Sequence, residues 1–97
     1  MIMTVLEAHL PAGQAETLQH MFEEGVRHLP RQMVQNYLTR STADTSLWQI
    51  VAIWRSRAAL DEYRSSVEVP GGVRMFRAVG AEPTLTIFEL VTVATNE

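Results

Sequence analysis

The alternation of apolar and polar positions in the first third of the chain predicts one strand and one helix. Residues 3–10 mix β-branched and other apolar side chains over one strand length, and Pro11-Ala12-Gly13 ends that pattern. From residue 14 to residue 29, apolar side chains recur every three or four positions, at Ala15, Leu18, Phe22, Val26 and Leu29. This spacing places them on one face of a helix, and Pro30 cannot continue it.

The rest of the chain predicts two strands, a second helix and a last strand. Residues 32–39 and 47–54 are strand candidates, and the polar run 41–46 between them predicts a hairpin. Because segment 47–54 is the most apolar, we expect it at the centre of the sheet. Ser56 can cap the next helix, whose inward positions are Ala59, Leu60, Tyr63 and Val67. The run 70–72 (Pro-Gly-Gly) interrupts this helix, 73–79 can add one or two turns, and 84–91 is the last strand.

This order of elements predicts an α+β fold, a ferredoxin-like βαββαβ sandwich with a four-stranded antiparallel sheet. With 97 residues, 46% of them hydrophobic and 20% charged, we expect one domain over 1–97. The two helices would cover one face of the sheet. Alternate apolar residues on the other face indicate a partner rather than solvent, so we expect a homodimer with sheet packed against sheet.

Composition excludes several classes of function. A net charge of −3 with dispersed arginines gives no basic stripe for nucleic acid. The sequence has no cysteine and no lysine, which excludes disulfides, thiolate chemistry and Schiff-base catalysis. With no apolar run of membrane-spanning length and no signal-like start, we expect no membrane association and a cytoplasmic protein. We also expect no metal site, because no cluster of three or four ligands is visible.

Segment 53–63, which reads IWRSRAALDEY, carries a resemblance to a known family. A strand that ends in Trp54, the helix cap Ser56, and Ala and Leu at fixed offsets resemble the signature of the antibiotic-biosynthesis monooxygenase family. The resemblance implies a homodimer whose two sheets form a dimeric α+β barrel, with a small apolar pocket between sheet and helices in each subunit. It also implies oxygenation of phenolic or quinol-type substrates without a cofactor, in which the substrate anion itself donates an electron to oxygen.

Histidine positions differ from those of the family. Tyr63 stands where many members carry His, and a phenol is a weaker base than an imidazole at neutral pH. Haem-degrading members need a His ligand from the second half of the chain. All three histidines here, His9, His20 and His28, lie in the first third. The resemblance therefore does not extend to haem degradation.

The candidate catalytic residues are His9, Tyr63 and Trp54. His9, at the end of the first strand, can act as a general base or be a solvated bystander. Trp54 and Trp48 share strand parity, so they can stack on a flat ligand or fill the core. Tyr63 is open to the same two interpretations, a core tyrosine or a pocket hydroxyl.

Further candidate substrate contacts are Tyr37, Asn36, Met75 and Phe76. Tyr37 and Asn36 face opposite sides of the sheet, and the sequence does not say which faces the pocket. Met75 and Phe76 suit an adaptable pocket wall or an ordinary core. Together these residues predict a cofactor-independent monooxygenase of a small aromatic or quinol-like molecule. The alternatives are a non-redox isomerase, lyase or cyclase, and a non-catalytic dimeric ligand-binding module.

Overall fold

A computed structural model describes residues 1–96 and contains one four-stranded antiparallel sheet with three helices. The elements follow the order β1 (Ile2–His9), α1 (Ala15–Gly25), β2 (Met33–Arg40), β3 (Leu47–Trp54), α2 (Arg57–Ser66), α3 (Gly71–Ala78) and β4 (Thr84–Glu89). The strands lie in the order β2-β3-β1-β4. The ferredoxin-like α+β fold, the β2–β3 hairpin and the central position of β3 are therefore confirmed.

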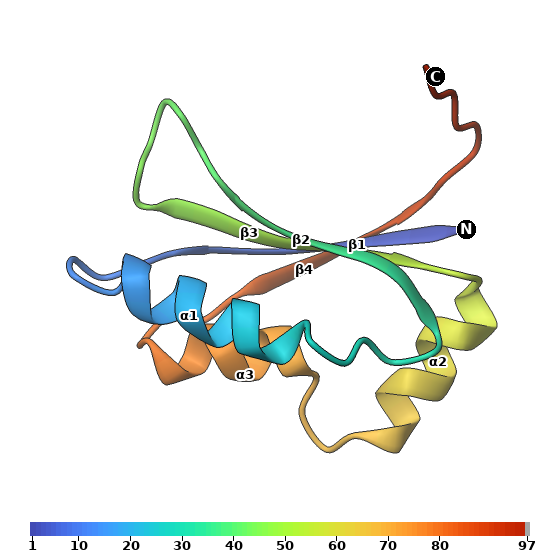
Figure 1. Cartoon of the computed structure of the whole chain (residues 1–97), viewed down its shortest axis with the longest axis horizontal. Coiled ribbons are helices and arrows are strands. Elements are labelled where there is room, and N and C mark those ends of the chain that lie inside the picture. The colour runs from blue at the N-terminus through green and yellow to red at the C-terminus, as the bar shows by residue number, and fades with distance from the viewer. Residues whose placement is uncertain (97) are drawn as a thin grey trace.

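All three helices lie on the same side of the sheet (Figure 1). Even-numbered residues of β1 and β3, such as Leu6 and Ile50, are buried beneath them, whereas the odd-numbered residues are partly exposed on the other face. This period of two is the pattern of a sheet covered on one face only. In the described part of the chain, no helix is long and apolar enough to cross a membrane.

The first helix is shorter than the predicted 14–29. α1 ends at Gly25, and the Arg27 N–H then bonds to the Glu24 carbonyl at 3.4 Å, which is the tighter spacing of a closing turn. Glycine is a poor helix former, and this explains the early end. As a result Leu29, expected on the buried face of the helix, is 39% exposed.

The buried residues form two separate hydrophobic clusters on the helix side of the sheet. The larger one lies against α1 and α3 and includes Leu6, Ile50 and Phe76. The smaller one, Ala52, Trp54 and Leu60, lies under α2. The break between α2 and α3 leaves space between the two clusters, and this space positions the candidate site.

Candidate functional site

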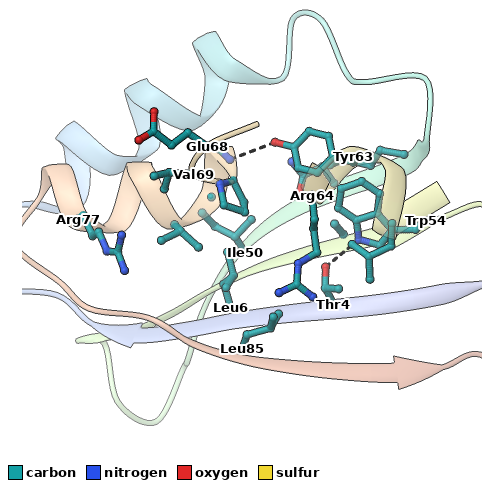
Figure 2. A pocket seen from close by; sticks show the side chains of 18 residues that line it. Thr4, Leu6, Ile50, Trp54, Tyr63, Arg64, Glu68, Val69, Arg77 and Leu85 are labelled. Atoms are coloured by element: carbon teal, nitrogen blue, oxygen red, sulfur yellow. Dashed lines mark hydrogen bonds between the residues drawn. The ribbon is translucent and has the colours of Figure 1, made fainter. Parts of the chain in front are cut away.

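A cavity of about 350 Å³ lies between the two hydrophobic clusters. Its floor is the helix-facing side of the sheet, and its walls come from α2, the loop that follows α2, and the start of α3 (Figure 2). Ligand pockets in proteins typically measure roughly 300–1,000 Å³. The cavity is therefore large enough for a small organic molecule.

The floor of the cavity consists of side chains from all four strands. Thr4, Leu6, Ile50 and Ala52 come from the two central strands, with Asn36 on β2 beside Ala52. They share the floor because alternate residues of a strand point to one face, and the pairing aligns these positions. The floor is mainly apolar, with two polar groups.

One of these polar groups is engaged and the other is not. The indole Nε1 of Trp54 donates a 2.8 Å hydrogen bond to Oγ1 of Thr4, and both residues are buried. Oδ1 of Asn36 is buried without a hydrogen-bond partner among the described residues. An unpaired buried polar atom costs about 1–3 kcal/mol. Asn36 is thus a polar group of the site that the protein itself does not satisfy.

The wall formed by α2 presents Leu60, Tyr63 and Arg64 to the cavity. These positions are three and four residues apart, so they share one helix face. Ser56 fixes the start of the helix, since its Oγ accepts a hydrogen bond from the Ala59 N–H at 3.0 Å. The Tyr63 ring packs on Trp54 with centroids 5.0 Å apart and planes tilted by 43°. The wall is therefore aromatic where it meets the floor.

The roof is the loop after α2 together with the start of α3. Its backbone is tied to the wall because the Gly71 N–H donates to the Tyr63 hydroxyl oxygen at 3.1 Å. Since that oxygen accepts from Gly71, its own proton is free to donate to a ligand. Gly72 approaches the floor so closely that a Cβ there would lie 2.6 Å from Cδ1 of Leu6. Only glycine fits at this position without displacing Leu6.

Three charged residues border the cavity: Arg64, Glu68 and Arg77. Arg77 donates three hydrogen bonds of 2.8–3.3 Å to the Glu82 carboxylate. These bonds raise the pKa of Arg77 and lower the pKa of Glu82. The Arg64 side chain makes no hydrogen bond or ion pair with any described residue. The guanidinium groups at the two ends of the cavity therefore differ, one compensated and one not.

Three of the predicted site residues, Trp54, Tyr63 and Asn36, line the same cavity. His9 does not. It lies opposite Leu47 at the far end of β1, five residues or about 17 Å from Thr4. Its side chain is 66% exposed, with Nδ1 3.0 Å from Oγ of Ser46 and 3.6 Å from the Asp44 carboxylate.

The other predicted contacts also lie outside the cavity. Trp48 is on the helix side of β3 as expected, but six residues or about 20 Å separate it from Trp54, so the two cannot stack on one small ligand. The Arg40 guanidinium lies 5.3 Å from the centroid of the Trp48 ring. Tyr37 faces the open side of the sheet, opposite Val51.

Of the two roles predicted for Phe76 and Met75, pocket wall or ordinary core, the structure shows the second. Phe76 is fully buried in the larger cluster, and Met75 packs against that cluster close to Gly25. Sequence reasoning missed Thr4 and Arg64. Arg64 carried a readable signal, because it follows Leu60 by four positions and so shares its helix face.

Within residues 1–96, no group of three or more His, Asp or Glu side chains is placed to hold a metal ion.

The model of the antibiotic biosynthesis monooxygenase family matches residues 1–75, which is most of the chain. The chain belongs to this family. Among curated proteins, none matches the sequence.

Solved structures similar to this family member share its fold over nearly the whole chain. A predicted antibiotic biosynthesis monooxygenase from Deinococcus radiodurans is 11% identical with a TM-score of 0.75, covering 100% of this chain and 99% of that one. Another from Bordetella bronchiseptica is 13% identical, with a TM-score of 0.76 and coverage of 94% and 97%. A mutant of MhuD, bound to two manganese protoporphyrin IX molecules per active site, is 16% identical, with a TM-score of 0.77 and coverage of 99% and 100%. At such low identity these structures show the fold alone.

Proposed function

We propose that this family member is a cofactor-independent monooxygenase of a small aromatic or quinol-like substrate. The observation that carries the proposal is the cavity itself, a largely apolar space whose Trp54 and Tyr63 rings meet at one corner. Flat rings pack well against such surfaces. The Tyr63 hydroxyl supplies a hydrogen-bond donor at the same place, because its oxygen already accepts from Gly71.

The proposed chemistry needs little from the protein. An electron-rich hydroxylated ring loses a proton, and its anion transfers an electron to oxygen. The ring carbon para to the hydroxyl, which is a CH₂ in the keto tautomer, is then oxidised to a carbonyl. One oxygen atom enters the product, and the other leaves as water with the two hydrogens lost from the substrate. The substrate supplies all four electrons. Tyr63 would orient the substrate oxygen by a hydrogen bond, and the apolar walls would exclude water from the reacting carbon.

Haem is not part of this proposal, although the MhuD neighbour binds a metal porphyrin. Of the three histidines, none lines the cavity in the described chain. His9 lies at the far end of β1, and His20 and His28 are exposed on α1 and just after it. The cavity therefore offers no imidazole to a haem iron.

Oxygen uptake in the presence of substituted hydroquinones, naphthols and anthrone-type compounds tests the oxygenase proposal. We expect uptake that depends on both enzyme and substrate, and that continues in the presence of a metal chelator. Tyr63→Phe should lower the rate about 100- to 1,000-fold, the size expected for one hydrogen-bond donor to a developing anion. Tyr37→Phe is the matched control, because Tyr37 lies on the open face and should keep the full rate. Turnover without oxygen consumption would instead indicate an isomerase, lyase or cyclase.

A second candidate function, a non-catalytic ligand-binding module, is favoured by one observation. Among the described residues that line the cavity there is no histidine to act as a base near neutral pH. His9, the predicted base, is solvent-exposed beside Ser46. Binding of hydroxylated aromatics without turnover or oxygen uptake would establish this second function.

We also propose that the protein is a homodimer with the open sheet faces packed together. The large side chains on this face remain accessible, with Tyr37 44% and Phe88 45% exposed. Val5, Val51 and Ile53 lie between them at partly exposed positions. Contiguous apolar patches of this kind typically mark interaction surfaces. A second copy would cover the patch without leaving either sheet face in water.

Sedimentation equilibrium tests the dimer. Val51→Glu places a charge at the centre of the open face and should convert a dimer into a monomer. Gln19→Glu, on the exposed side of α1, adds the same charge elsewhere and should leave the mass unchanged. A monomeric wild-type protein, or a dimer unaffected by Val51→Glu, would contradict the proposal.

A further inference from the structure

The arginines of this chain differ in how their charges are compensated. Of eight, four form ion pairs with a carboxylate in the described chain: Arg27, Arg31, Arg57 and Arg77. Arg40 lies over the Trp48 ring, and Arg55 donates to the Arg31 carbonyl. Arg64 and Arg74 have neither kind of partner among residues 1–96. Of these two, only Arg64 borders the cavity.

Arg64 extends from α2 towards the sheet, with its guanidinium directed to the side of the cavity formed by Thr4 and Leu85 (Figure 2). The residue is exposed, so this end of the side chain stands at the mouth and not in the dry interior. Leu85, 44% exposed on the edge strand β4, marks the same mouth. A ligand in the cavity would therefore present one end to Arg64 and the other to the apolar floor.

The remaining charges around the cavity leave the Arg64 charge uncompensated. Arg77 is held by the Glu82 carboxylate, with the shortest contact at 2.8 Å. The Glu68 carboxylate is turned away from Arg64 (Figure 2), and no ion pair joins them in the described structure. The mouth therefore offers one positive charge with five N–H donors to a bound molecule.

We propose that the ligand of this cavity is an aromatic carboxylate, whose ring system lies against Trp54 and Tyr63 and whose carboxylate is bound by Arg64. The inference rests on the site of the proposed function and adds a substrate class to it. A planar guanidinium matches a carboxylate in a two-point hydrogen-bonded geometry, which distinguishes it from a general positive charge. The carboxylate stays at the wet mouth, so its desolvation is limited, while the ring gains from apolar burial.

Calorimetric titration with two matched pairs of compounds tests the assignment: benzoate with benzamide, and 2-naphthoate with 2-naphthamide. Each pair shares its ring and its shape but differs in charge. We expect the wild-type protein to bind the carboxylate of at least one pair about fivefold more tightly than the amide. Because an exposed charge is screened by salt, the preference should shrink as ionic strength rises.

Variants separate Arg64 from the general charge of the protein. Arg64→Gln should remove the carboxylate preference by weakening carboxylate binding much more than amide binding, and Arg64→Lys should keep only part of it. Arg74→Gln is the matched control, because Arg74 is also uncompensated but does not border the cavity; it should keep the full preference. The inference is overturned if wild-type protein shows no preference in either pair, including the case of no binding, or if Arg64→Gln retains it.

These experiments test the ligand class and the oxygenase activity separately. Carboxylate binding that depends on Arg64, without oxygen uptake, would support the ligand class and reject the oxygenase. Oxygen uptake with neutral quinols, without any carboxylate preference, would support the oxygenase and reject the ligand class.

Discussion

Trp54 and Thr4 are joined by a buried hydrogen bond that links the two central strands beneath the cavity. The indole Nε1 lies 2.8 Å from Oγ1 of Thr4, and the two side chains are 4% and 7% exposed. The bond crosses the sheet diagonally, since Trp54 is paired with Ile2 and Thr4 with Ala52. It orients the largest aromatic ring of the site through a residue fifty positions away in the sequence.

Breaking this bond should destabilise the protein measurably. Thr4→Val leaves the indole N–H buried without a partner, so we expect the free energy of unfolding to fall by about 1–3 kcal/mol. Thr4→Ser keeps the hydroxyl and is the matched control, with a much smaller loss. In a double-mutant cycle by urea denaturation, Thr4→Val with Trp54→Phe should cost less than the sum of the single changes. Additive effects would show that the bond contributes nothing to stability.

Two neighbouring glycines should respond differently to the same substitution. A Cβ on Gly72 would lie 2.6 Å from Cδ1 of Leu6, and Leu6 lines the cavity. Gly72→Ala should therefore push Leu6 into the cavity and cost about 1–3 kcal/mol of stability, with a marked loss of ligand affinity. A Cβ on Gly71 would meet the Tyr63 hydroxyl at 3.5 Å and the Arg74 guanidinium at 4.0 Å, both ordinary contacts, so Gly71→Ala should leave stability and affinity nearly unchanged. Thermal denaturation and ligand titration of both variants measure this difference, and equal effects would contradict the close packing at Gly72.

Replacing Asn36 by an apolar residue should raise the stability of the protein and weaken its binding of a ligand. Replacement by leucine, of similar shape, removes a buried oxygen that has no partner in the described chain, so Asn36→Leu should raise the free energy of unfolding by about 1 kcal/mol. The same change should weaken a ligand that donates a hydrogen bond in the cavity. Asn36→Asp, which buries a charge instead, should be destabilised. A destabilised Asn36→Leu protein would show that the amide has a partner in solution.

Acid titration should reveal the cluster around Asp44 in the β2–β3 loop. Hydrogen bonds from the Ser46 hydroxyl at 2.7 Å and the Ser46 N–H at 3.0 Å hold the pKa of Asp44 below its ordinary value. A carboxyl whose pKa is lowered by folding stabilises the protein above its ordinary pKa, and the contribution is lost as pH falls through the folded pKa. Carbon-13 NMR should show that Ser46→Ala raises the pKa of Asp44. Glu89, distant on β4, provides the internal reference, and an unchanged Asp44 pKa would exclude this cause.

Much of the fold follows from local patterns in the sequence. A period of two marks the helix-facing residues of β1 and β3, and the three- and four-residue spacing places Leu60 and Tyr63 on the inner face of α2. Ser56 marks the start of that helix, and Pro70 marks the gap between α2 and α3, although the two glycines after it belong to α3 and not to the gap. These features depend on neighbours within a few residues, so the sequence alone determines them.

Only the tertiary structure decided which side chains converge on the cavity. The antiparallel register that pairs Ile2 with Trp54 brings Thr4 beneath the indole and carries His9 to the opposite end of the sheet. Six residues of strand separate Trp48 from Trp54, although the two side chains point to the same face of the sheet. Arg64 and Asn36 meet at the cavity because α2 forms one of its walls and β2 contributes to its floor. Local periodicity determines which face of the sheet a side chain occupies, whereas contacts between distant segments decide which residue it lies opposite.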